Sequence, residues 1–316
     1  MTFVSNDPSF WPLIDLELSY SYWTVAAGVV VVYDWVLTIG QEIELIWRQR
    51  WSLMTVLYLV SRYIGIPFVV ATVLETIPLV SLTDAVSNIF EPALVWTNMV
   101  QDALLGVIMI ARLHAMYQGS RIMLIFLVII FLGINIACGV STALPLKYLS
   151  SEELVLSDMY YVCFHIYGGN PLLLSIYWIL NTVWEVLALC LSVWIAVKHF
   201  RDLRRLDLST GSIIGDCFRV LIKSHVLYFA SFAAVSCLQL SYLSPVILSD
   251  NDSIGIIILN GANNVLMVVQ MFVLGPRLIL SVREYNAKLV ANSDAETSMN
   301  SIVFQERVHV STSSTV

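Results

Sequence analysis

Seven long apolar segments constrain the fold of this chain more than any other feature of its sequence. Each runs for about 20 residues or more, whereas a strand of a membrane barrel needs only about 9–11. Within a bilayer, only helices and closed barrels satisfy every backbone polar group. We therefore expect membrane-spanning helices at about residues 20–40, 52–74, 93–117, 121–144, 170–197, 219–244 and 254–280.

The composition agrees with a chain whose solvent is lipid. Of the 316 residues, 58% are hydrophobic and only 12% are charged, whereas a soluble domain carries about 25% charged residues. Prolines mark the edges of the expected helices, at positions 78, 92, 145, 171 and 245. The sequence thus predicts an all-α integral membrane protein, in which residues 20–284 form a seven-transmembrane-helix bundle.

The basic residues indicate the orientation of this bundle. Nearly all of the 16 Lys and Arg residues fall in every second gap between the apolar segments or in the C-terminal part. The other gaps hold Lys147 alone, and Arg62 lies inside a segment. Because Lys and Arg stay on the cytoplasmic side, we expect residues 1–19 to be extracellular and the C-terminus to be cytoplasmic.

Two cytoplasmic features suggest a partner on the inner face. Residues 285–316 are rich in Ser and Thr and have too few large apolar side chains to fold, so we expect a disordered cytoplasmic tail. The fifth gap carries a cytoplasmic basic patch, made of Lys198, Arg201, Arg204 and Arg205. Patch and tail could together bind a cytoplasmic signalling partner, and we expect the plasma membrane rather than an internal membrane.

Four charged residues lie at membrane depth, where each costs a few kcal/mol and needs a partner in the bundle interior. At 1.5 Å per residue, Asp34 and Arg62 lie about 9 and 15 Å from the inner ends of the first two helices. We therefore expect a structural intramembrane ion pair between Asp34 and Arg62. One arginine cannot neutralise three carboxylates, so at least one of Asp102 and Glu185 is protonated, hydrated or bound to another group.

Polar side chains also share faces of three expected helices, because their spacing is close to the helical period. This set could line a central cavity for a ligand or an ion, and it consists of Asn98, Asp102, Asn181, Glu185, Asn260, Asn263 and Asn264. The amides could instead form hydrogen bonds that hold neighbouring helices together. The sequence leaves both interpretations open.

No pattern indicates catalytic or cofactor chemistry. None of the five His residues has a ligand at i, i+4 spacing, and the chain has neither a glycine-rich phosphate loop nor a GxSxG motif. The last expected helix contains no Lys that could form a Schiff base with retinal. We expect no enzymatic activity, metal, cofactor or nucleic-acid partner. The sequence does not decide the oligomeric state, or whether Cys138 and Cys163 form a disulfide.

Residues 31–64 carry a recognisable motif, which runs Tyr33-Asp34, Leu37-Thr38, Glu42, Glu44-Leu45-Ile46-Trp47, Arg50-Trp51 and Arg62-Tyr63. It resembles the N-terminal signature of a large fungal, chiefly basidiomycete, family of seven-helix membrane proteins of unknown function. The resemblance implies a multipass membrane protein, and it brings no ligand, reaction or catalytic residue. It also places Asp34, Glu42 and Arg62 in one shared motif, which implies that they form a structural unit.

Three functional hypotheses follow. The expected orientation, the basic patch and the Ser/Thr-rich tail favour a receptor-like sensor. Asp102, Glu185 and the amides favour a transporter or proton-coupled carrier instead, and a membrane scaffold is the third hypothesis. G-protein-coupled receptors share the expected topology, but their motifs do not follow here: the third helix ends in Arg112-Leu113-His114, and the last contains Gly275-Pro276-Arg277.

Overall fold

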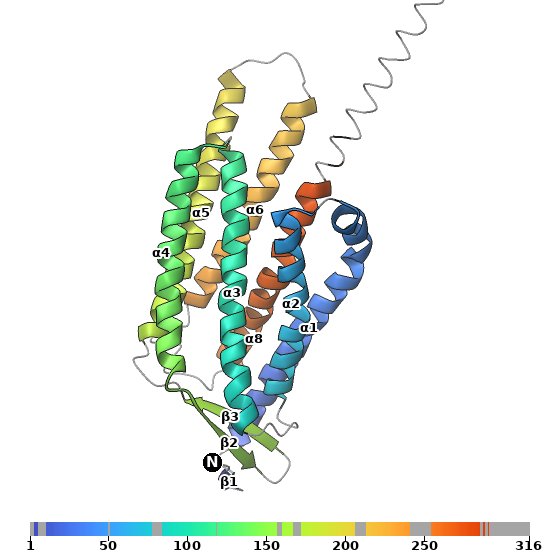
Figure 1. Cartoon of the computed structure of the whole chain (residues 1–316). Coiled ribbons are helices and arrows are strands. Elements are labelled where there is room, and N and C mark those ends of the chain that lie inside the picture. Colours follow the sequence, from blue (N-terminus) through green and yellow to red (C-terminus); the bar gives the residue numbers. More distant parts are fainter. Residues whose placement is uncertain are drawn as a thin grey trace, which may run out of the picture.

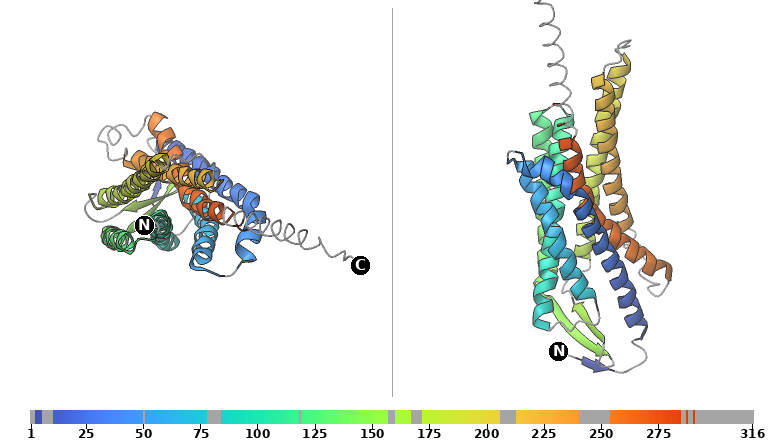
Figure 2. Two further views of the ribbon diagram at one scale, coloured as in Figure 1. Left: turned by 90° about the horizontal axis from the view of Figure 1, so that it is seen from above. Right: turned by 90° about the vertical axis from the view of Figure 1, so that its right-hand side faces the viewer.

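The computed structural model of the chain describes residues 3–5, 11–49, 51–77, 84–117, 119–156, 160–166, 172–205, 213–240, 254–284, 287 and 290. Long helices run side by side along one common direction, and a small sheet lies at one end of the bundle, close to the N-terminus (Figure 1). At the opposite end, α5 (Leu172–Arg205) and α6 (Ile213–Leu240) project beyond the other helices (Figure 2).

The remaining helices are α1 (Trp11–Glu42), η2 (Ile43–Trp47), α2 (Leu53–Thr76), α3 (Asp84–Met116), α4 (Arg121–Leu146), α8 (Ile254–Val269) and η4 (Gln270–Leu274). Both η2 and η4 are π-helical turns, which continue α1 and α8 without a break. After η4 the helix returns to α geometry and runs to residue 284. We call residues 254–284 the last helix.

Within the described residues, six helices are long and apolar enough to cross a membrane, namely Ile14–Trp47, Leu53–Thr76, Val86–Met116, Arg121–Leu146, Ser175–Lys198 and Gly255–Glu284. The prediction of an α-helical, multipass membrane protein is therefore confirmed. The apolar part of α6 within the described residues, Val226–Leu240, is shorter than a full span. The expected disordered tail falls outside the described residues, apart from positions 287 and 290.

The outer surface of α4 shows why this bundle needs lipid around it. Large aliphatic side chains recur there every three or four residues and are all more than half exposed: Ile122, Ile125, Ile129, Leu132, Ile136 and Val140. This spacing places them on one face of the helix. A continuous apolar stripe of this kind is unfavourable in water but matches the hydrocarbon core of a bilayer.

Several helices extend beyond the apolar segments that predicted them. The expectation that Pro92 marks the edge of a helix is wrong, because α3 begins at Asp84 and contains this proline. Pro145 does mark a helix edge, because it is the penultimate residue of α4. The first turns of α3 and the end of α5 are polar, so hydropathy does not detect them, although Glu, Lys and Arg are good helix formers.

The sheet at the end of the bundle is absent from the sequence prediction. β1 (Phe3–Ser5) pairs in parallel with β2 (Ser150–Leu156), which pairs antiparallel with β3 (Tyr160–Ile166). In this register Phe3 lies opposite Leu154, and Glu153 lies opposite Cys163. The all-α class is therefore incomplete, because seven-residue strands lie below the length that a search for membrane helices detects.

The core consists of two clusters that share α3. Leu105 and Ile108 pack with α1, α2 and the last helix, whereas Met109 and Leu113 pack with α4, α5 and α6. Close helix contacts depend on small residues: a Cβ on Gly65 of α2 would lie 2.8 Å from Cδ1 of Phe272 in η4. The last helix thus packs tightly against α2 at its π turn.

Candidate functional site

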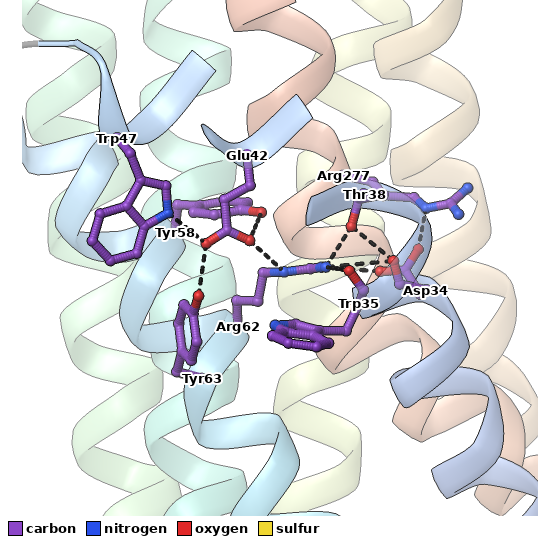
Figure 3. A network of polar contacts seen from close by, with 9 residues as sticks. All are labelled: Asp34, Trp35, Thr38, Glu42, Trp47, Tyr58, Arg62, Tyr63 and Arg277. Carbon is purple, nitrogen blue, oxygen red and sulfur yellow. Dashed lines mark hydrogen bonds and ion pairs between the residues drawn. The ribbon is translucent and has the colours of Figure 1, made fainter. Parts of the chain in front are cut away.

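A buried ionic network centred on Arg62 joins α1 to α2 (Figure 3). The Nη1 atom of Arg62 lies 3.0 Å from Oδ2 of Asp34, and its Nε atom lies 3.1 Å from Oε2 of Glu42. All three side chains are at most 4% exposed. Asp34 and Glu42 are two helical turns apart on α1, and the guanidinium group of Arg62 bridges them.

The remaining donors of Arg62 also have partners on α1. Its Nη2 atom donates to the carbonyl oxygens of Trp35 and Asp34, at 3.2 and 3.4 Å, and to the hydroxyl of Thr38. Thr38 in turn donates to the carbonyl oxygen of Asp34, at 2.7 Å. All three nitrogen atoms of the guanidinium thus have hydrogen-bond partners, and these offset part of the cost of burying its charge.

Three aromatic side chains complete the coordination of Glu42. The hydroxyls of Tyr58 and Tyr63 donate to its carboxylate at 3.2 and 2.9 Å, and the indole nitrogen of Trp47 donates at 3.1 Å (Figure 3). Trp47 reaches back five residues because the chain between them forms the π turn η2. Glu42 is therefore held at both oxygens although it is completely buried.

Arg277 of the last helix is the second cation of this network. Its Nε atom lies 2.5 Å from Oδ1 of Asp34, and its side chain is 45% exposed. Two arginines and two carboxylates give the network a formal charge of zero. The predicted ion pair between Asp34 and Arg62 is therefore incomplete, because it leaves out Arg277.

A nearby contact fastens the end of the last helix to the turn between α1 and α2. Nη1 of Arg283 donates to the carbonyl oxygen of Leu45 at 2.8 Å, and Nη2 donates to the hydroxyls of Ser52 and Thr55 at 3.0 and 2.6 Å. Ser52 is also the N-cap of α2 and forms a capping box with Thr55. The last helix is thus bound to the first two helices at two levels.

A second polar cluster lies between α3, α5, α6 and the last helix. The hydroxyl of Tyr177 donates to Oδ2 of Asp102 at 2.5 Å. Nε2 of Gln270 donates to Oε1 of Glu185 at 3.0 Å, and the hydroxyl of Ser236 donates to Oε2 of the same carboxyl group. All three donors are uncharged, in contrast to the arginines of the first network.

Both carboxyl groups line one small cavity. Its wall consists of Asp102, Trp178, Asn181, Glu185, Ser236, Gln239, Met267, Gln270 and Met271. The volume open to the centre of a water molecule is about 10 Å³, which is room for about one water molecule or one small ion. The site is therefore far too small for an organic ligand in this conformation.

The structure brings together only part of the predicted cavity set. Asp102, Asn181 and Glu185 line the cavity, whereas the other four members do not: Asn98, Asn260, Asn263 and Asn264. Asn264 instead donates to Thr24 of α1 at 3.1 Å, which is a hydrogen bond between helices. The prediction of one shared cavity is wrong for these four residues, because helical spacing defines a face but not the helix it packs against.

Sequence reasoning missed several polar residues of the bundle interior. Gln270 and Ser236 hold Glu185, and fully buried Gln101 donates to Ser61 and, at 2.8 Å, to the carbonyl oxygen of Met271. A glutamine inside an apolar segment is the pattern that could have identified Gln101 and Gln270. Gln101 binds η4 and Gln270 is its first residue, and the sequence does not reveal the position of this π turn.

The basic patch that we expect on the cytoplasmic side lies at the end of α5 that is distant from the sheet. Lys198 and Arg201 are exposed, whereas the side chains of Arg204 and Arg205 fall outside the described residues. Cys138 is a free and buried thiol, so it forms no disulfide with Cys163. In the described part of the chain, no group of three or more His, Cys, Asp or Glu residues could hold a metal ion.

Comparisons with known proteins identify one segment of the chain. A search of the curated proteins found no match. The model of a family described as a family of unknown function (DUF6533) matches residues 22–67. This segment covers most of α1, all of η2 and the first part of α2, and it contains Asp34, Glu42 and Arg62. The chain therefore shares with a family of unknown function the segment that forms most of the Arg62 network.

Proposed function

We propose that this protein is a receptor-like sensor of the plasma membrane, without enzymatic activity, with seven spans and an extracellular N-terminus. The 28-residue helix α6 would be the seventh span, since it is about 42 Å long at 1.5 Å per residue. The expected orientation rests on the basic residues, which favour the cytoplasmic side. The exposed Arg201 supports this orientation. It lies on the projecting end of α5, whereas the N-terminal strand β1 lies in the sheet at the opposite end of the bundle (Figure 1).

The observation that carries the proposal is that one helix contacts both polar clusters. Gln270 binds Glu185 at the cavity, and Arg277, seven residues later on the same helix, binds Asp34 in the Arg62 network. Along the helix axis these positions are about 10 Å apart. A displacement of the last helix at the cavity would therefore alter the ion pairs nearer the inner end. A sensor requires this kind of link between two sites.

The π turn between these two contacts supports the same interpretation. η4 begins at Gln270 and ends at Leu274, immediately before the segment that carries Arg277. π turns occur frequently at functional sites. A change from π to α pairing within η4 would rotate Arg277 relative to Gln270, because the two geometries differ in residues per turn. In this proposal, η4 is the part of the last helix that changes between a π and an α arrangement.

The proposed partner is a GTP-binding protein that docks on the cytoplasmic basic patch. The test uses the full chain in nanodiscs and a panel of purified GTP-binding proteins. We expect binding with faster nucleotide exchange, and we expect the combined change R201E, R204E and R205E to abolish both, because it reverses the charge of the patch.

Lys147→Glu is the matched control, because it reverses one charge at the end of the bundle that carries the sheet. This variant should bind as the unmodified protein does. Absence of binding by every GTP-binding protein tested would contradict the proposal. Undiminished binding by the triple variant would contradict the role of the patch.

A transporter or proton-coupled carrier is the second candidate, and the cavity favours it. Asp102 and Glu185 face the same small space, and their described partners are neutral. Carriers use intramembrane carboxyl groups of this kind to move protons or ions. If this candidate is correct, ion or proton flux into liposomes should disappear in the double variant D102N/E185Q. Flux that survives both substitutions would exclude this mechanism.

A further inference from the structure

The two carboxyl groups at the cavity have no cationic partner within the part of the chain that the structure describes. Asp102 accepts a hydrogen bond from Tyr177, and Glu185 accepts hydrogen bonds from Gln270 and Ser236. Two arginines of the helical interior bind other groups, since Arg62 binds Asp34 and Glu42, and Arg112 of α3 donates to the carbonyl oxygen of Leu278 at 3.2 Å. Two ionised carboxylates without a cation would be costly at membrane depth.

An independent observation at the same cavity comes from Gln270. This residue is 7% exposed and lines the cavity, and its Oε1 atom is buried without a hydrogen-bond partner among the described residues. Its amide nitrogen is already used, because it donates to Glu185. A buried amide oxygen normally has a donor or a cation beside it. The cavity thus offers an unused oxygen ligand next to two carboxyl groups.

We propose that Asp102, Glu185 and Gln270 form an intramembrane site for one monovalent cation, either a sodium ion or a proton. This inference rests on the contacts at the cavity alone, and it does not depend on the receptor-like function. Its available ligands are oxygens, namely two carboxyl groups, the Gln270 amide and the Ser236 hydroxyl. Oxygen ligands suit hard cations.

The size of the cavity favours a monovalent over a divalent cation. Calcium takes six to eight oxygen ligands, and magnesium retains several of its waters, whereas this cavity has room for about one water-sized particle. Among the described residues, two other titratable groups lie near the site, namely the Tyr177 hydroxyl, which donates to Asp102, and the buried Cys138 thiol of α4. Neither carries a positive charge.

The first experiment measures thermal unfolding of the purified full chain in sodium chloride and in choline chloride at equal ionic strength. If sodium binds, Tm should rise with sodium concentration, by roughly 3 °C or more at about ten times the dissociation constant. D102N and E185Q should each abolish the rise, because each removes a negative charge with little change in volume. Gln270→Leu should weaken sodium binding at least roughly tenfold.

Asp15→Asn is the matched control, because this acidic residue is exposed on α1 and does not line the cavity. The sodium-dependent rise in Tm should persist in this variant. If a cavity variant fails to fold, the comparison of Tm in sodium chloride and in choline chloride still shows whether the unmodified protein binds sodium. Stabilisation by magnesium or calcium but not by sodium would overturn the proposal.

The second experiment distinguishes a proton from a sodium ion. Infrared spectroscopy detects the carbonyl stretch of a protonated carboxyl group, which is absent from an ionised one. If the cation is a proton, the unmodified protein in choline chloride should show this band, and D102N and E185Q should each reduce it. A protein with neither sodium-dependent stabilisation nor a carbonyl band assignable to Asp102 or Glu185 would overturn the inference.

Discussion

At the scale of single residues, charge pairing separates the two polar clusters. Asp34 and Glu42 face two arginines, whereas Asp102 and Glu185 face hydroxyl and amide groups. The sequence predicts contact between Asp34 and Arg62 from their depths alone. It does not predict the second cation, Arg277, because the expected helix of residues 254–280 includes this residue without showing which neighbouring helix its side chain reaches.

Arg62→Ala tests the Arg62 network. The substitution leaves the buried Glu42 carboxylate without a cation and leaves Asp34 with Arg277 alone, so we expect a loss of about 3–5 kcal/mol in unfolding free energy. The yield of monodisperse protein after extraction should fall accordingly. Arg121→Ala, which removes an exposed arginine at the start of α4, should leave the yield unchanged. If Arg62→Ala expresses normally while Asp34→Ala does not, the assigned pairing is wrong.

At the scale of elements, the π turns explain why helical periodicity does not predict the contacts made by Trp47 and by Arg277, which lie at the end of η2 and beyond η4. η2 follows Glu42 and brings Trp47 back to it, and η4 begins at Gln270. A π turn shifts the helical phase of every later residue. Helix existence could therefore be predicted from apolar length, whereas the rotation of each face about its axis could not.

Gly65→Ala tests the close packing of α2 against η4. A new Cβ would lie 2.8 Å from Cδ1 and 2.9 Å from Cγ of Phe272, so we expect a loss of about 1–3 kcal/mol from overpacking. Gly133→Ala is the matched control, because a Cβ there meets no atom within 4 Å. It should preserve or slightly raise the unfolding free energy. Equal effects of both variants on the unfolding midpoint would contradict the tight contact.

At the scale of the whole molecule, apolar length and composition suffice to predict a helical membrane protein. They do not predict the sheet, whose strands are three and seven residues long and join segments that lie far apart in the sequence. Helical spacing groups Asn260, Asn263 and Asn264 on one face, but it does not show whether that face lines the cavity at Asp102, because spacing contains no information on which helices are neighbours. Tertiary packing supplies that information.

The proposed orientation can be tested with single cysteines at two exposed positions. Lys147→Cys, beside the sheet, should react with a membrane-impermeant maleimide in intact cells. Arg201→Cys, at the far end of α5, should react only after permeabilisation, because we expect this end to be cytoplasmic. The unmodified protein measures the background from its native cysteines. Labelling of Arg201→Cys alone in intact cells would show that the protein has the opposite orientation.

The central claim is that the last helix couples the cavity to the Arg62 network, and a double-mutant cycle of unfolding free energies tests it most directly. The cycle combines Glu185→Gln with Arg277→Gln, and a second cycle combines Glu185→Gln with Arg121→Gln as control. Coupled sites give an interaction energy of about 0.5 kcal/mol or more, whereas independent sites are additive within about 0.3–0.5 kcal/mol. We predict coupling in the first cycle and additivity in the second. Additivity in both would contradict the account.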